Sequence, residues 1–161
     1  MSLRDIPLTT IDGDTITLAE YANQSVLIVN VASRCGLTPQ YEQLEELQKT
    51  YGDRGFTVLG FPSNQFRQEL GSETEIKEYC SMTWGVTFPM FAMVNVNGKS
   101  QHPLYAELTK VEDSRGQAGK VQWNFEKFLL TQDDRITRFR PRTRPDDPEV
   151  VSAIERSLPA E

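Results

Sequence analysis

Two apolar runs on either side of an amphipathic stretch constrain the fold of this chain more than any other feature. Residues 26–31 and 56–61 are rich in β-branched and aromatic side chains, as buried strands are. Residues 39–51 between them carry large apolar side chains on one helical face: Tyr41, Leu44, Leu47 and Tyr51. Because a helix that joins two neighbouring strands returns the chain to the same end of the sheet, the pattern predicts a parallel βαβ unit.

Shorter signals on both sides extend this unit. Residues 8–11 and 15–18 are expected to form an N-terminal β-hairpin around a two-residue Asp12-Gly13 turn. The S-x-x-E pattern from Ser72 to Glu75 is a capping box that opens a helix. Downstream, the pattern predicts a strand at 90–96, a helix at 104–110, an inward-packed stretch at 123–130, a strand at 136–139 and a helix from Asp147-Pro148. Because no clean helix separates the later strands, they are expected to be antiparallel. The predicted fold class is therefore α/β, a central mixed β-sheet flanked by helices on both faces.

The size and charge of the chain exclude several classes of protein. Its 161 residues suit a single domain, 1–161, with one core. The net charge of −6 and the lack of a basic patch argue against nucleic acid or an anionic membrane as a partner. No apolar run approaches the roughly 20 residues that span a bilayer, and the N-terminus does not read as a signal peptide. We therefore expect a cytoplasmic protein.

The cysteine and histidine content narrows the chemistry. The chain has two cysteines, Cys35 and Cys80, which are expected to be thiols at rest in a reducing compartment. It has one histidine, His102, in a polar turn-like stretch where a surface or structural role is expected. These counts cannot build a His/Cys metal cluster within one chain, so no metal and no cofactor is expected.

Cys35 lies at the junction between the first apolar run and the amphipathic stretch. Thr38-Pro39 is a favourable helix opening, a hydroxyl cap followed by proline. A thiol at such a junction lies near unpaired backbone N–H groups and a partial positive charge, and both favour the thiolate. A free cysteine is also often a small buried hydrophobic residue. The position alone leaves both interpretations open.

Three segments carry a resemblance that decides between them. NVASRCGLT (30–38), LGFPSNQF (59–66) and WNFEKF (123–128) resemble the signature segments of the glutathione peroxidase family, and TFPMF (87–91) is similar to the family's segment before its third core strand. The segments occur in the family's order and spacing, and the resemblance covers nearly the whole chain. The resemblance implies a thioredoxin-like fold.

The resemblance also implies a set of active-site residues. The peroxidatic residue of the family corresponds to Cys35, and the family's tryptophan and asparagine correspond to Trp123 and Asn124. The family's glutamine is best matched by Gln68, in a loop one residue shorter than the usual spacing, and less well by Gln65. Read without the resemblance, Trp123 is a core aromatic residue at a helix start and Asn124 a helix cap.

The chemistry of these residues fits a thiolate that neutral groups stabilise. No histidine is placed to deprotonate Cys35, and hydrogen bonds to the charged form of a thiol favour that form. The same donors can orient a peroxide and stabilise the departing oxygen. The available donors are the indole N–H of Trp123, the amides of Asn124 and Gln68, and the backbone N–H groups near Gly36 and Leu37.

Cys80 matches the position of a resolving cysteine in members that use thioredoxin-like reductants; the alternative is a cysteine packed on the apolar face of its helix, with Ile76 and Tyr79. A disulfide with Cys35 requires the two Cα atoms to lie within about 7 Å. We expect Cys80 to lie far from Cys35 in the reduced protein, in a locally labile helix. Deep burial of Cys80 in a rigid helix would count against this role.

The resemblance implies a thiol peroxidase that reduces hydrogen peroxide and organic hydroperoxides through a Cys35 sulfenic acid, with thioredoxin or glutathione as the reductant. One alternative is a thioredoxin-fold disulfide oxidoreductase, although Thr38 stands where a C-x-x-C motif needs its second cysteine. The other is a non-enzymatic binding or transport accessory protein. Larger members carry an insertion near the short stretch 112–120, so a monomer or weak dimer with an open site is expected.

Overall fold

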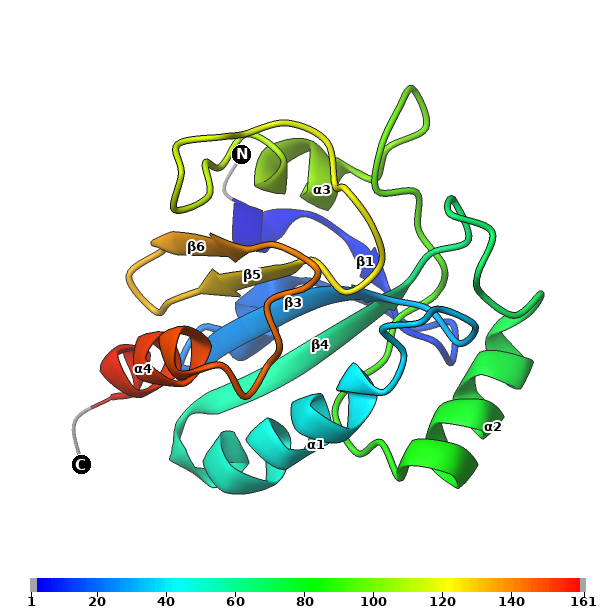
Figure 1. The fold of residues 1–161 in the computed structure, drawn as a ribbon, viewed down its shortest axis with the longest axis horizontal. Coiled ribbons are helices and arrows are strands. Elements are labelled where there is room, and N and C mark those ends of the chain that lie inside the picture. Colours follow the sequence, from blue (N-terminus) through cyan, green and yellow to red (C-terminus); the bar gives the residue numbers. More distant parts are fainter. Residues whose placement is uncertain (1–2, 160–161) are drawn as a thin grey trace.

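A mixed four-stranded sheet forms the centre of the computed structural model, which describes residues 3–159 (Figure 1). Strand β3 (Ser25–Val31) pairs in parallel with β4 (Phe56–Pro62). On the other side of β3, β5 (Lys127–Leu130) is antiparallel, and β6 (Ile136–Phe139) is antiparallel to β5. The sheet order is β4-β3-β5-β6. The predicted parallel βαβ unit and the predicted antiparallel later strands are both confirmed.

Helices cover both faces of this sheet. Helix α1 (Gln40–Tyr51) and helix α4 (Pro148–Ser157) pack over one face, and α3 (Pro103–Leu108) lies over the other, as Figure 1 shows. Helix α2 (Glu73–Trp84) packs beside α1. Side chains alternate along β3, so Leu27 and Val29 join one hydrophobic cluster while Val26 and Ile28 join the other. Within residues 3–159, three short 3-10 helices complete the helical content: Leu3–Asp5, Leu18–Tyr21 and Gly52–Arg54.

Among residues 3–159, no helix is both long enough and apolar enough to cross a membrane.

The N-terminal hairpin is present but differs from its prediction. Strands β1 (Leu8–Thr9) and β2 (Thr15–Ile16) are two residues each. The Thr10 N–H donates to the carbonyl of Asp14 at 2.8 Å, and the Gly13 N–H donates to the carbonyl of Thr10 at 2.9 Å. These bonds close a three-residue loop, so the predicted two-residue turn is wrong. Gly13 has a φ of 94°, the left-handed conformation that ends such three-residue loops.

The strand predicted at residues 90–96 is also wrong. The segment lies along β4, where the Phe91 N–H donates to the carbonyl of Gly60 at 2.9 Å, but its pairing is limited to isolated bridges at Met90 and Phe91. The Met93 N–H donates to the Glu73 carboxylate at 3.3 Å rather than to a neighbouring strand. The N–H of Val94 instead donates to the carbonyl of Pro62 at 2.9 Å, so the pairing with β4 slips by one residue after Phe91 and the segment stays irregular.

Three of the α-helices, α2, α3 and α4, have side-chain caps at their starts. The Ser72 hydroxyl accepts a hydrogen bond from the Glu75 N–H at 3.2 Å, which confirms the predicted cap of α2. Asp147 caps α4 in the same way, accepting from the Glu149 N–H at 2.9 Å. His102 Nδ1 accepts from the backbone N–H two residues further on, at 3.1 Å. His102 is therefore a structural cap of α3, in line with its predicted structural role.

Candidate active site

Cys35 follows the end of β3 and precedes α1, with 8% of its surface exposed. Its Sγ atom accepts two hydrogen bonds, one from Trp123 Nε1 at 3.1 Å and one from the Leu37 backbone N–H at 3.3 Å. Both donors were predicted from the sequence, and both are neutral. Two N–H groups from different segments of the chain therefore meet at one sulfur.

The predicted helix cap at Thr38 is wrong, because its hydroxyl is used inside the Cys35 loop. Thr38 Oγ1 accepts from the Cys35 N–H at 2.9 Å and donates to the carbonyl of Ala32 at 2.9 Å. The start of α1 has no side-chain cap at Pro39. Thr38, which follows Cys35, is thereby bonded to Cys35 itself and to Ala32 before it, and these bonds fix the position of the thiol.

Trp123 and Asn124 lie in the turn before β5, outside any helix, so the alternative reading of a helix start at these residues is wrong. Asn124 is fully buried, and its Nδ2 donates to Gln68 Oε1 at 3.2 Å. The carbonyl of Gln68 in turn accepts from the N–H of Arg34, next to Cys35, at 2.7 Å. The structure therefore brings Gln68 beside Asn124, on a backbone bonded to the Cys35 loop.

The shortened loop that carries Gln68 has an unusual backbone. Arg67, the single residue between Phe66 and Gln68, has a φ of 58°, which is uncommon outside glycine. Gln65 is committed elsewhere: its Oε1 accepts from the N–H groups of Val96 at 2.6 Å and Asn97 at 2.8 Å. These contacts favour Gln68 over Gln65 as the active-site glutamine.

Cys80 lies on α2 with 1% of its surface exposed. Burial raises the pKa of the Cys80 thiol to about 11, and the negative charge of Glu69 acts in the same direction. Both cysteines are free thiols in the structure. This deep burial is the result that counts against a resolving role in an intact helix, so such a role requires local opening of α2.

A broad cavity of about 740 Å³ opens beside the two hydrogen-bond donors of Cys35. Leu37 and Trp123 form part of its wall. The rest of the lining is mostly polar and includes the arginines Arg115, Arg138, Arg140 and Arg142. Cys35 itself is not among the lining residues, so the cavity adjoins the two donors rather than the sulfur.

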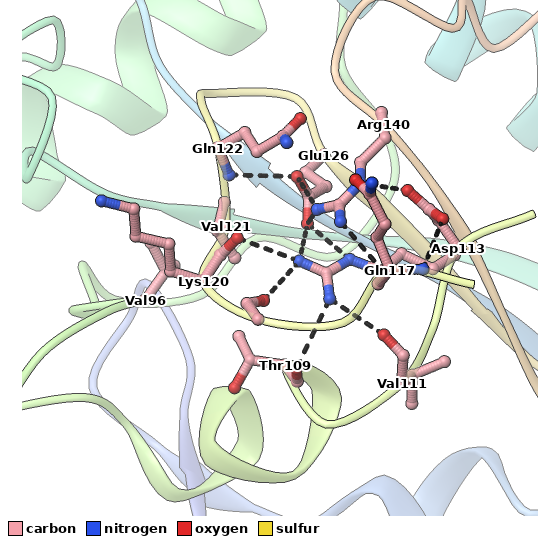
Figure 2. Close-up of polar contacts among 12 residues, drawn as sticks. Val96, Thr109, Val111, Asp113, Gln117, Lys120, Val121, Gln122, Glu126 and Arg140 are labelled. Atoms are coloured by element: carbon pink, nitrogen blue, oxygen red, sulfur yellow. Dashed lines mark hydrogen bonds and ion pairs between the residues drawn. The ribbon is translucent and has the colours of Figure 1, made fainter. Parts of the chain in front are cut away.

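Sequence reasoning missed the network that supports the Trp123 turn (Figure 2). The fully buried Glu126 carboxylate accepts from Arg138 Nε at 2.8 Å and from Arg140 Nη1 at 3.1 Å. Arg138 also donates to the carbonyls of Val111 at 2.9 Å and Gly119 at 2.7 Å, which ties the preceding loop to β6. The signal was an acidic residue within WNFEKF and two arginines at alternate positions, Arg138 in β6 and Arg140 directly after it.

Residues 3–109 match the family model for glutathione peroxidase. The chain belongs to the glutathione peroxidase family. A relative from Escherichia coli (strain K12), thioredoxin/glutathione peroxidase BtuE, is 49% identical, and the match covers 97% of this chain and 99% of that protein. The crystal structure of Trgpx in its apo form superposes with a TM-score of 0.74 at 35% identity and covers 99% of both chains.

More distant structures show the fold alone. A thioredoxin family protein from Chlorobium tepidum TLS superposes with a TM-score of 0.64 at 20% identity, over 92% of each chain. The predicted thioredoxin-like fold is therefore confirmed. So is the predicted enzyme class, because a member of the glutathione peroxidase family is a peroxidase that uses hydroperoxides and thiol reductants.

Proposed function

We propose that Cys35 is the peroxidatic nucleophile of this glutathione peroxidase. The observation that carries the proposal is the pair of N–H groups, from Trp123 and Leu37, that bond its sulfur at 3.1 and 3.3 Å. The thiolate attacks one peroxide oxygen, so that an S–O bond forms as the O–O bond breaks. Cys35 becomes a sulfenic acid, and the second oxygen takes up a proton and leaves as water or an alcohol.

Trp123, Asn124 and Gln68 act on this reaction without forming covalent bonds. Asn124 donates to Gln68 Oε1, which leaves the Gln68 Nε2 group available to a substrate oxygen. The Trp123 indole N–H stabilises the thiolate before attack. A donor placed where charge develops on the leaving oxygen lowers the barrier to cleavage. Both hydrogen peroxide and organic hydroperoxides are proposed as substrates.

Cys80 is proposed as the resolving cysteine. Its thiol attacks the Cys35 sulfenic acid, water leaves, and a Cys35–Cys80 disulfide forms that an external dithiol reduces by exchange. Both side chains belong to the same hydrophobic cluster, which supports an encounter once α2 opens. Thioredoxin and glutathione are both candidate donors, as the name of the Escherichia coli relative suggests. We further propose a monomer or weak dimer in the reducing cytoplasm, where its two cysteines rest as thiols.

Stopped-flow and steady-state kinetics test this function directly. Wild type, Cys35→Ser and Cys80→Ser are each mixed with hydrogen peroxide or cumene hydroperoxide and supplied with thioredoxin or glutathione. We expect no reaction in Cys35→Ser, and in Cys80→Ser one oxidation of Cys35 followed by loss of thioredoxin-dependent turnover.

Ser81→Ala, at the next position of α2, is the matched control and should turn over like wild type. Turnover of Cys80→Ser with thioredoxin at the wild-type rate would rule out the resolving role of Cys80. Peroxide reduction by Cys35→Ser would rule out Cys35 as the nucleophile.

A further inference from the structure

Asn30 is a fully buried polar residue of β3, five positions before Cys35, that bonds the active-site turn at three points. Its Nδ2 donates to the carbonyl of Trp123 at 3.1 Å, and its Oδ1 accepts from the N–H of Glu126 at 3.1 Å. Its own backbone carbonyl accepts from the N–H of Phe125 at 2.6 Å. Both polar atoms of the side chain are thus committed to residues 123–126.

The turn at residues 123–126 has a backbone conformation that requires support from its surroundings. Phe125 has a φ of 66°, the left-handed region that bulky residues rarely adopt and that persists only where the surroundings enforce it. Trp123 is 38% exposed, and its ring contacts Phe66 with a centroid separation of 4.9 Å. Packing on one face of a partly exposed ring leaves its direction to be set by the backbone that carries it.

Glu126 closes the turn from the opposite side. Its Oε1 accepts from the N–H of Gln122 at 3.1 Å, and Figure 2 shows this bond beside the contacts that Arg140 makes with the same carboxylate. The segment from Gln122 to Glu126 is therefore bonded to itself at its ends and to Asn30 at its centre. Movement of the Trp123 backbone relative to Cys35 requires these bonds to break.

We propose that Asn30 is a positioning residue for the peroxidatic centre, holding the 123–126 turn so that the Trp123 indole N–H points at the Cys35 sulfur. This inference rests on the proposed role of Cys35. Strand β3 then positions both partners of the N–H···S contact. It leads directly into the loop that carries the Cys35 sulfur, and its Asn30 side chain holds the turn that carries the Trp123 donor. The N–H···S contact of 3.1 Å is sensitive to displacement of either end.

A purely structural role makes a different prediction. Asn30 lies where the ladder between β3 and β5 ends, since Val29 is the last residue of β3 paired with β5. If its side chain only terminates the ladder, its loss lowers stability and leaves the reactivity of Cys35 in the folded protein unchanged. If it acts through Trp123, its loss changes that reactivity and has no further effect once the indole is gone.

A double-mutant cycle on Cys35 reactivity tests the proposal. Asn30→Ala, Trp123→Phe and the double variant are each made with Cys80→Ser, so that Cys35 is the single thiol. Two readouts are taken: the rate of one oxidation by hydrogen peroxide in stopped flow, and the pH profile of Cys35 alkylation by iodoacetamide. We expect Asn30→Ala and Trp123→Phe each to slow the oxidation about tenfold and to move the alkylation profile to higher pH, with no further change in the double variant.

Gln48→Ala is the matched control, because Gln48 is also an amide that bonds backbone, accepting from the N–H of Val58 at 2.8 Å on β4. This variant should lose thermal stability without a change in the pH profile of Cys35 alkylation.

A wild-type alkylation profile in Asn30→Ala would overturn the proposal. So would effects of Asn30→Ala and Trp123→Phe that add in full in the double variant. If Asn30→Ala does not fold, Asn30→Ser carries the same comparison, since its hydroxyl can still bond one of the two partners. Peroxide reduction that survives Cys35→Ser would remove the proposed function itself, and the role of Asn30 with it.

Discussion

At the scale of single residues, a buried lysine directly follows the active-site turn. Lys127 has no exposed surface, and its Nζ donates to the carbonyl of Pro141 at 2.9 Å. Burial lowers the pKa of Lys127 to about 7, although the neighbouring Glu126 carboxylate acts in the opposite direction. In the unfolded chain a lysine has an ordinary pKa of about 10.4. The folded protein therefore releases this proton several pH units earlier than the unfolded chain does.

This difference makes stability depend on pH with a definite sign. Between about pH 7 and pH 10 the unfolded state binds the extra proton, so Lys127 makes the free energy of unfolding rise with pH, by up to about 1.4 kcal/mol per unit. Below about pH 7 both states hold the proton, so this dependence on pH disappears and the full cost of burying the charged lysine remains. Urea unfolding of wild type and Lys127→Met from pH 6 to 9 should show a curve that rises less steeply in the variant. Lys49→Met, at an exposed position of α1, is the control; parallel curves for wild type and Lys127→Met would contradict the assignment.

The residues that donate to Cys35 could be predicted from the sequence, whereas those that hold the donors could not. Trp123 and Leu37 follow from a motif and from adjacency in the chain. The bonds of Thr38 to the Cys35 loop and of Asn30 to the Trp123 turn join residues whose proximity only the folded chain creates. A hydroxyl before proline can cap a helix or bond the backbone of a preceding loop, and the local sequence does not distinguish these two roles.

At the scale of elements, the stability of α2 controls access to Cys80. Ser72→Ala removes the side-chain cap at its start, a loss of about 1 kcal/mol, and should increase the open population of the helix roughly fivefold. Alkylation of Cys80 in the folded protein and amide exchange along α2 should both accelerate by that factor, as read by mass spectrometry. Asp147→Ala removes an equivalent cap from α4 and should leave Cys80 unchanged. Equal acceleration in both variants would mean that Cys80 is reached through global unfolding.

The sequence predicted well those elements whose secondary structure follows from the apolar pattern of their own residues. The observed bounds of β3, β4, β6 and α1 agree with the predicted bounds within about two residues. The apolar pattern of each of these segments fits one type of secondary structure only. The hairpin loop and residues 90–96 failed for another reason. The segment 90–96 is apolar enough for a strand, yet the Glu73 carboxylate binds the Met93 N–H. Pairing of short strands is decided by partners distant in sequence.

At the scale of the whole molecule, the exposed surface bears on association. Stable interfaces bury about 800 Å² on each partner around an apolar core. Among residues 3–159 the large hydrophobic side chains that are well exposed are Met82, on α2, and Trp123, in the turn before β5. Two such side chains on separate elements do not make an apolar patch of that size, and the net charge of −6 opposes self-association.

The reduced protein should therefore sediment as a monomer of 18.3 kDa across micromolar concentrations in sedimentation velocity. Peroxide treatment should leave this mass unchanged, because the proposed Cys35–Cys80 disulfide forms within one chain. In Cys80→Ser the oxidised Cys35 has no partner in its own chain, so treatment should yield a fraction of disulfide-linked dimer that dithiothreitol removes. Disulfide-linked dimers in treated wild type but not in Cys80→Ser would show that Cys80 joins separate chains, and would overturn resolution within the monomer.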